Sequence, residues 1–179
     1  MDDFLKHIDR SWTLFLDRDG VINKRLIDDY IKSWDEFVFL PGVKESIKIF
    51  SEHFGRIIIV TNQQGIGRGL MTETSLKNIH RKMVAEITSS GGRIDGIYYC
   101  TDLKSRVPNC RKPSVTMFEQ AKRDFPDIEA SKCIMAGDSQ SDMEFGKNAG
   151  MFRVYIGGDN NFANVCFTDL ISFAEAIVK

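Results

Sequence analysis

The chain lacks long apolar runs and has almost no net charge. No apolar run among its 179 residues approaches the roughly 20 residues that a helix needs to cross a bilayer. The opening segment, MDDFLKHIDRSW, has no apolar core of the kind found in secretory signals. Lys and Arg total 24 against 25 Asp and Glu, which gives a formal charge of −1. We therefore expect neither a membrane nor a nucleic acid as a partner.

Cysteine is scarce too, and the chain has only Cys100, Cys110, Cys133 and Cys166. An even number permits two disulfides, but in a chain of this size without a secretory signal reduced thiols are the better interpretation. We therefore predict reduced cysteines and a cytoplasmic protein. No repeat, low-complexity segment or linker interrupts the chain, so residues 1–179 are expected to form a single domain.

Short apolar runs and helical patterns alternate along the sequence. Runs that are apolar on both faces predict buried parallel strands at residues 12–16, 56–60, 94–99, 132–136 and 152–156. Apolar residues spaced three and four apart predict helices that begin at Val43 and after Thr72, a good N-cap residue, with further helices over 114–124, 139–148 and 169–179. The alternation indicates an α/β domain with a mostly parallel sheet and right-handed crossovers.

Polar side chains follow several of these predicted strands. Asp17 and Asp19 come directly after the first, Thr61 follows the second, and Asp138 follows the fourth. In an open parallel sheet, ligands bind beyond the carboxyl ends of the strands. An Asp-x-Asp pair alone is more often a polar turn. Three carboxylates at one sheet edge, however, indicate a bound cation, and oxygen ligands suit a hard ion such as Mg²⁺.

Four short motifs resemble, in order, those of phosphatases of the haloacid dehalogenase superfamily. They are residues 15–23 (FLDRDGVIN), 60–63 (VTNQ), 111–113 (RKP) and 137–142 (GDSQSD). The match runs from about residue 12 to residue 157, and four motifs in order are far more specific than one. The resemblance implies a Rossmann-like α/β fold, with helices on both faces of a mostly parallel sheet and no large cap domain.

The resemblance also implies a reaction, the hydrolysis of a phosphomonoester through an aspartyl-phosphate. Asp17 would attack phosphorus, and Asp19 would first protonate the leaving group and then activate water. Thr61 and Lys112 would hold the phosphoryl group. The implied cofactor is Mg²⁺, bound by Asp17, by the backbone carbonyl of Asp19 and by Asp138.

Asp142 has two compatible interpretations. With Ser139 it forms a Ser-x-x-Asp capping pattern that opens a helix. The resemblance also implies that Asp142 supports the metal site or Lys112.

Within the superfamily, the sequence most resembles the histidinol-phosphate and heptose-bisphosphate phosphatases. The segments that carry this resemblance are 17–23, 37–43 (FVFLPGV), 61–69 (TNQQGIGRG) and 110–113 (CRKP). In that branch, short loops shape the substrate pocket, and here they would be about 23–34, 63–71 and 100–110. Arg68 and Arg111 are the candidates for binding a second anionic group, because arginine binds phosphate in a bidentate manner. Asn62 and Gln63 are further candidates for substrate contacts.

The expected substrate is a small phosphorylated sugar or amino alcohol. D-glycero-D-manno-heptose 1,7-bisphosphate, losing its 7-phosphate, ranks first, and histidinol phosphate ranks second. A 3′-phosphorylated polynucleotide ranks third, because four acidic residues of the first loop region would repel its backbone: Asp28, Asp29, Asp35 and Glu36. The alternative outside enzymology is a catalytically inactive binding module. A monomer is expected.

The same branch commonly holds a structural zinc in its third loop, through a Cys-x-His and a later Cys-x-Cys. Here Cys100 and Cys110 match the outer positions, while Asp102 and Pro108 stand at the other two. A closed structural zinc site needs four nitrogen or sulfur ligands. We therefore predict no zinc, two ordinary half-buried thiols, and a loop held by its own contacts.

Overall fold

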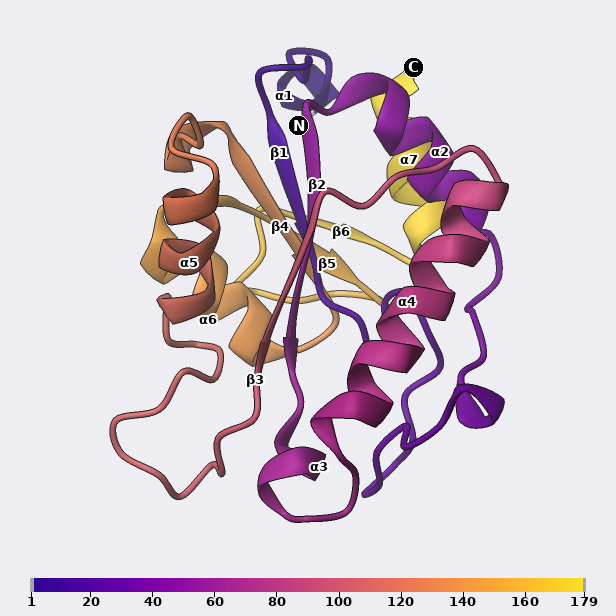
Figure 1. Cartoon of the computed structure of the whole chain (residues 1–179). Helices are drawn as coiled ribbons and strands as arrows, with labels where there is room; N and C mark the ends of the chain where they lie inside the picture. Colours follow the sequence, from indigo (N-terminus) through magenta and orange to yellow (C-terminus); the bar gives the residue numbers. More distant parts are fainter. Residues whose placement is uncertain (1, 179) are drawn as a thin grey trace.

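The computed structural model describes residues 2–178, with side chains from residue 4 onward. Its centre is a six-stranded parallel sheet with the order β3-β2-β1-β4-β5-β6 (Figure 1). The strands are β1 (Thr13–Leu16), β2 (Arg56–Asn62), β3 (Gly96–Cys100), β4 (Cys133–Gly137), β5 (Phe152–Ile156) and β6 (Val165–Phe167). The first five lie at the predicted positions, within two residues at either end.

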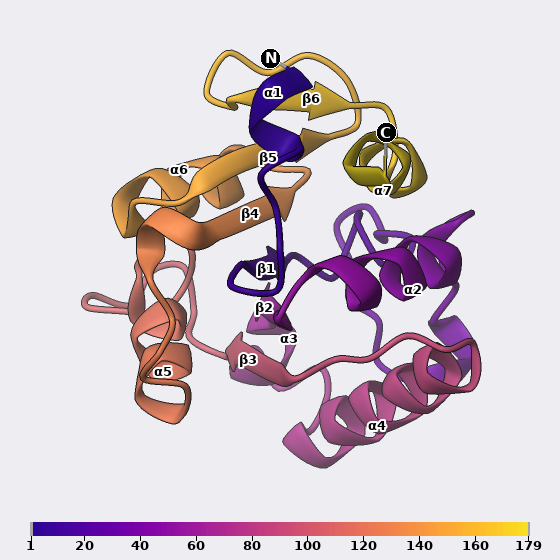
Figure 2. The same cartoon turned by 90° about the horizontal axis from the view of Figure 1, so that it is seen from above.

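Helices cover both faces of the sheet, as predicted. Figure 2 shows α2 (Val43–His53), α4 (Glu73–Ser89) and α7 (Leu170–Val178) on one face, and α5 (Thr116–Asp124) and α6 (Gln140–Ala149) on the other. Successive side chains of β2 pack against the helices on opposite faces of the sheet, since side chains alternate across a strand. Ile57 and Ile59 join the core cluster that includes the α2, α4 and α7 residues. Ile58 and Val60 join the cluster on the α5 side.

The predicted helix caps are present. Thr72 begins α4 as its N-cap, and its hydroxyl accepts a hydrogen bond from the Ser75 backbone N–H at 3.0 Å. Ser139 and Asp142 form a capping box at the start of α6. The capping interpretation of Asp142 is therefore confirmed.

Five short elements within the described residues were not predicted. They are the helices α1 (Asp2–Leu5) and α3 (Gln64–Gly67), the 3-10 helices η1 (Trp34–Glu36) and η2 (Ala130–Lys132), and the edge strand β6. Each has only three or four residues, which is too short to show a period. Tertiary contacts hold them instead: in α1, for example, the Phe4 ring stacks on Phe152 with centroids 3.8 Å apart. No helix within residues 2–178 is long and apolar enough to cross a membrane.

Three loops project from the carboxyl ends of the strands, at the lower end of the molecule in Figure 1. They join β1 to α2, β2 to α4 through α3, and β3 to α5. No large cap domain interrupts residues 2–178. The polar residues that follow β1, β2 and β4 therefore lie at the floor of a site whose walls are loops.

The expectation that all four cysteines are reduced is wrong for one pair. Cys100 and Cys110 form a disulfide across the third loop, with Cα atoms 5.5 Å apart, so they are not two separate half-buried thiols. Cys133 and Cys166 are free. The loop folds back so that the end of β3 meets the residue before Arg111, and composition alone gives no sign of such a return. Asp102 lies within the same group of candidate ligands, and the absence of zinc stays a prediction.

Candidate active site

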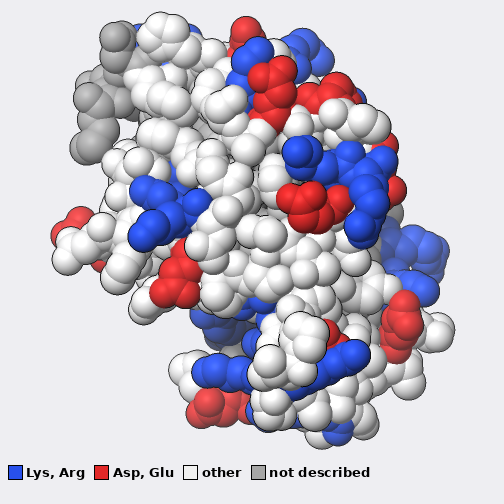
Figure 3. All heavy atoms as spheres, turned by 90° about the vertical axis from the view of Figure 1, so that its left-hand side faces the viewer, with Lys and Arg blue, Asp and Glu red and all other residues white. Residues whose placement is uncertain are grey.

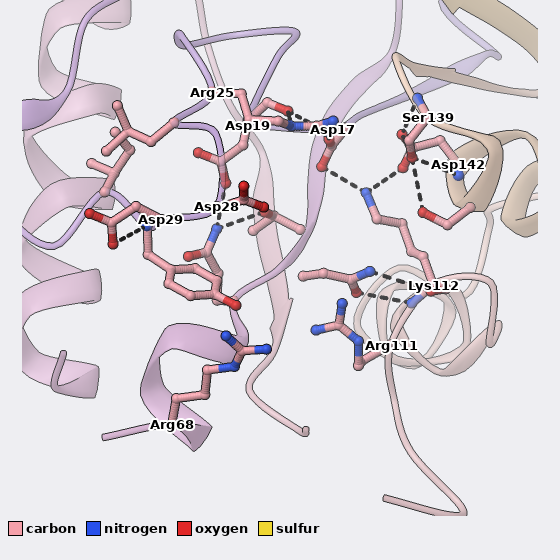
Figure 4. A pocket seen from close by; sticks show the side chains of 17 residues that line it. Asp17, Asp19, Arg25, Asp28, Asp29, Arg68, Arg111, Lys112, Ser139 and Asp142 are labelled. Carbon is pink, nitrogen blue, oxygen red and sulfur yellow. Dashed lines mark hydrogen bonds and ion pairs between the residues drawn. The ribbon is translucent and has the colours of Figure 1, made fainter. Parts of the chain in front are cut away.

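The sheet register brings the predicted site residues together. Leu16 of β1 lies beside Ile59 of β2 and Ala136 of β4, so the residues that follow these strands meet at one edge. They line a pocket of about 440 Å³, shown in Figure 4. Its lining includes nine of the ten predicted site residues: Asp17, Asp19, Thr61, Asn62, Gln63, Arg68, Arg111, Lys112 and Asp142. Asp138, the tenth, lies beside it and contacts Arg25, which lines the pocket.

Lys112 lies between two carboxylates in the interior. Its Nζ is 2.7 Å from Asp17 Oδ1 and 2.6 Å from Asp142 Oδ1, and it donates to the Val60 carbonyl at 2.8 Å. The lysine is only 4% exposed. Burial alone lowers the pKa of Lys112, but Asp142 and Asp17 outweigh that effect and raise it. The ammonium is therefore a permanent charge at the base of the pocket.

Asp17 is buried beside this ammonium. Burial raises the pKa of Asp17 to about 7. The charge of Lys112 lowers this pKa, but the carboxylates of Asp142 and Asp138 raise it further. The charged form thus requires further positive charge nearby. While Oδ1 is held by Lys112, Oδ2 faces Arg25 at 3.6 Å. One oxygen is therefore anchored and the other faces the loop.

The Asp19 side chain is held by three donors. Arg18 donates to both of its oxygens at 2.9 Å, Asn23 donates to Oδ1 at 2.9 Å, and Gln63 donates to Oδ2 at 2.8 Å. Burial raises the pKa of Asp19, but the charge of Arg18 and these hydrogen bonds outweigh it and lower the pKa overall. Arg18 and Asn23 belong to the first motif but had no predicted role, and both side chains fix the orientation of Asp19.

Behind Arg18 lies His80, which was not among the predicted site residues either. Its Nε2 is 3.1 Å from Arg18 Nη1. Because a guanidinium can only donate, the imidazole must accept and stays neutral. Burial, together with the Arg18 charge, lowers the pKa of His80 to about 3. The only sequence signal was a histidine on the apolar stripe of α4, between Ile79 and Met83.

This neutral histidine predicts a loss of stability in acid. Between pH 6.5 and about 3 the unfolded chain binds a proton at His80 that the folded chain does not, so the free energy of unfolding falls as the pH falls. The slope from one such proton is at most about 1.4 kcal/mol per pH unit. His80→Gln, which can still accept from Arg18, should flatten the slope. Urea unfolding from pH 7 to 4.5 measures it. An equal flattening in the control His53→Gln, at the end of α2, would contradict the assignment.

Asn62 and Gln63 bind neighbouring parts of the site. The Asn62 carboxamide accepts from the Lys112 backbone N–H at 3.0 Å and donates to the Lys112 carbonyl at 3.3 Å. The Gln63 carboxamide donates to the Thr61 hydroxyl at 2.9 Å as well as to Asp19. Both were predicted to contact substrate, and both line the pocket. Their hydrogen bonds within the chain support a positioning role.

Asp138 and the turn after β1 approach each other closely. Gly20 has φ +99°, and a Cβ at this position would collide with the Asp138 carboxylate. Only glycine permits both the conformation and the approach. Burial raises the pKa of Asp138 to about 6, against the opposing charge of Arg25.

Arg25 lines the pocket but was not among the predicted site residues. Its guanidinium donates to the Asp19 backbone carbonyl at 2.7 and 3.1 Å and to Asp138 Oδ1 at 2.8 Å. The same group lies 3.6 Å from Asp17 Oδ2. Three oxygens from two strand ends therefore converge on one cationic group. An oxygen-only donor set with two carboxylates fits Mg²⁺, and Asp17, Asp19 and Asp138 are the ligands that the sequence predicted.

The three loops pack against one another above this floor. Gly65 of α3 has no room for a Cβ, which would lie 2.9 Å from the Tyr30 ring, and a Cβ on Gly67 would collide with the Thr101 carbonyl. Gln64 joins the loops by donating to the Tyr30 hydroxyl at 3.1 Å. Gly65 and Gly67 therefore allow the loops to pack closely against one another.

Arg68 and Arg111 form the positive side of the pocket. Arg68 lies over the Tyr30 ring, 5.8 Å from its centroid, and Figure 4 shows both guanidinium groups opposite the carboxylates. Burial, with a further contribution from Arg68, lowers the pKa of Arg111. Figure 3 shows several basic side chains at the lower end of the molecule with acidic ones beside them, and both signs on the face above. The Arg111 guanidinium also donates to the Asp102 backbone carbonyl at 3.5 Å, and two guanidinium groups on one side of a pocket suit an anion.

The chain is similar to proteins of one family along most of its length. Residues 109–161 match the HAD-hydrolase-like family model. The chain is 38% identical over 174 residues to D-glycero-α-D-manno-heptose-1,7-bisphosphate 7-phosphatase of Mycobacterium bovis, which covers 93% of this chain and 92% of that protein. It is 36% identical over 131 residues to D-glycero-β-D-manno-heptose-1,7-bisphosphate 7-phosphatase of Neisseria meningitidis, a match that covers 73% of this chain and 69% of that protein.

A solved structure agrees with the sequence relatives. The crystal structure of D,D-heptose 1,7-bisphosphate phosphatase from Bordetella bronchiseptica, complexed with magnesium and phosphate, superposes with a TM-score of 0.84 at 30% identity. The match covers 93% of this chain and 98% of that one. Fold and sequence agree: the chain belongs to the haloacid dehalogenase superfamily of phosphatases, in the branch that contains the heptose 1,7-bisphosphate 7-phosphatases.

Proposed function

We propose that this chain removes the 7-phosphate of D-glycero-D-manno-heptose 1,7-bisphosphate, with Mg²⁺ as its cofactor. The observation that carries the proposal is the pair of charged regions in one pocket. Asp17, Lys112 and a cation-binding donor set lie at its floor, and Arg68 and Arg111 lie opposite. A bisphosphate has two anionic ends that match these two regions.

Each of these residues has a role in a two-step reaction. The free oxygen of Asp17 attacks phosphorus and forms an aspartyl-phosphate, while the sugar alkoxide leaves with a proton from Asp19. Asp19 must take up that proton before this step, because its lowered pKa keeps it ionised in the free site. Asp19 then takes a proton from water, which attacks the aspartyl-phosphate and releases inorganic phosphate with Asp17 restored. Lys112 and Thr61 hold the phosphoryl oxygens in place. Asp142 keeps Lys112 charged and oriented.

Asp17, the carbonyl of Asp19 and Asp138 would hold the magnesium ion. Bound there, the ion supplies positive charge to the phosphoryl oxygens and favours the ionised form of Asp17. Gly20 contributes by allowing the turn to approach Asp138.

Neutralising the two arginines should remove the preference for a bisphosphate. For Arg68→Met and Arg111→Met we expect kcat/KM for heptose 1,7-bisphosphate to fall on the order of tenfold to a hundredfold each, because a charge-assisted contact is lost. Turnover of a small aryl phosphate, which has no second anionic group, should change far less. The matched control is Lys104→Met, an exposed cation of the third loop.

The same substrate panel separates the alternatives. It contains both anomers of the bisphosphate, histidinol phosphate and a 3′-phosphorylated oligonucleotide. The second phosphate site would be contradicted if the arginine variants lost as much activity toward the aryl phosphate as toward the bisphosphate. It would also be contradicted if Lys104→Met lost as much activity toward the bisphosphate as the arginine variants do. A tenfold preference for histidinol phosphate in the unaltered enzyme would overturn the substrate, since that compound has only one phosphate. Asp28 and Asp29 line the pocket and weigh against an oligonucleotide.

A monomer and a cytoplasmic location stay predictions. The disulfide between Cys100 and Cys110 removes the argument from reduced thiols for that location.

A further inference from the structure

The Arg25 side chain connects the first loop to the floor of the pocket. Within the described residues, its hydrogen bonds go only to the Asp19 carbonyl and to Asp138, and its nearest other acidic partner is Asp17 Oδ2. These are the three oxygens assigned above to a divalent ion. Mg²⁺ binds oxygen ligands at about 2.1 Å, so the ion and the guanidinium cannot contact these oxygens together.

We propose that Arg25 is a built-in competitor of the divalent cation, so that cation binding displaces Arg25 and releases the first loop. The inference rests on the proposed function, because it requires these oxygens to hold the ion. Without a cation, Arg25 offsets the repulsion among the carboxylates. With the ion bound, that role passes to the metal.

The exposure of the two basic residues at the floor separates their roles. The Lys112 side chain is 2% exposed and the Arg25 side chain is 46% exposed. Displacing a buried ammonium would leave buried charge unpaired, which is costly. Displacing a half-exposed guanidinium moves it into water at modest cost, since exposed ion pairs are weak. Lys112 is thus a permanent counter-charge and Arg25 an exchangeable one.

Release of Arg25 also affects the substrate pocket. The loop that follows it contributes Leu26, Asp28, Asp29 and Tyr30 to the pocket lining. Arg25 is the residue of this loop that bonds to Asp138 from across the pocket floor. Cation binding and the position of this wall are therefore coupled, and each changes the free energy of the other.

Calorimetric titration of Mg²⁺ into the metal-free protein tests the proposal without relying on turnover. Arg25→Gln should bind the ion tighter by roughly five- to tenfold, the effect of one or two exposed charge-assisted hydrogen bonds that need not be broken. The affinity of Arg25→Lys for Mg²⁺ should lie between those of the unaltered protein and Arg25→Gln. Lys24→Gln, an exposed neighbour with the same charge change, should bind as the unaltered protein does. In thermal melts without metal, Arg25→Gln should unfold at a lower temperature than the unaltered protein. Adding Mg²⁺ should reduce this difference in unfolding temperature.

The outcomes distinguish this proposal from the proposed function. Unchanged or weaker binding in Arg25→Gln, or an equal gain in Lys24→Gln, would overturn the competition while leaving the phosphatase assignment untouched. If the unaltered protein bound no Mg²⁺ at all, the proposed cofactor would fail together with the competition.

Discussion

Asp17→Asn should abolish phosphate release while the protein stays folded. The amide cannot attack phosphorus as a carboxylate does, so we expect turnover to fall on the order of 10⁴-fold or more. The side chains are nearly isosteric, and Lys112 keeps its contacts with Asp142 and with the Val60 carbonyl. Since burial disfavours the charged form of Asp17, its replacement should change the free energy of unfolding by no more than about 1–2 kcal/mol.

Phosphate release from an aryl phosphate and from heptose 1,7-bisphosphate, with and without Mg²⁺, measures this loss. Urea unfolding checks the fold, and Asp35→Asn, an exposed residue of the first loop region, is the matched control. Residual activity above about one per cent in folded Asp17→Asn would show that another group is the nucleophile.

Lys112→Met should reduce both stability and catalysis. The substitution nearly preserves volume but leaves Asp17 and Asp142, which are 5% and 0% exposed, without their shared counter-charge. Breaking a buried ion pair in this way typically costs about 3–5 kcal/mol, and losing a fixed charge at the phosphoryl group costs on the order of 10²–10³ in kcat. The stability deficit should be largest near neutral pH and should shrink in acid, because Asp17, whose pKa is raised by burial, needs no counter-charge once it is protonated.

Urea unfolding at pH 7 and pH 5 measures the deficit, with Lys104→Met as the exposed control. The double variant Lys112→Met with Asp142→Asn removes one buried charge of each sign, so it should recover part of the stability without recovering activity. A Lys112→Met protein as stable as the unaltered one at pH 7 would mean that the Lys112 ammonium is not the counter-charge on which the buried carboxylates depend.

The sheet and the catalytic floor were predictable because local signals determine them. Five apolar runs identified five strands, and strand ends in a parallel sheet meet at one edge. Asp17, Thr61 and Asp142 were therefore placed correctly in one pocket before their contacts were known. The matches to relatives confirm the fold and the phosphatase activity that the motifs implied.

Contacts between residues distant in sequence were not predictable. His80 pairs with Arg18 across 62 positions, and nothing in the apolar stripe of α4 marks that partner. Arg25 lies in a loop without periodicity, and its role depends on which way a long side chain points. The disulfide between Cys100 and Cys110 depends on how the third loop returns to the end of β3.

That disulfide bears on how such enzymes diverge. It joins the last residue of β3 to the residue before Arg111, and Asn62 holds the backbone of Lys112 from the neighbouring strand. Residues 101–109 thus form a ring with both ends fixed. Mutations within the ring can shift Arg111, which lines the pocket and contacts the Asp102 carbonyl, while leaving the hydrolytic residues in register. New substrates are therefore accessible to descendants of this chain through changes confined to a segment that the chemistry does not use.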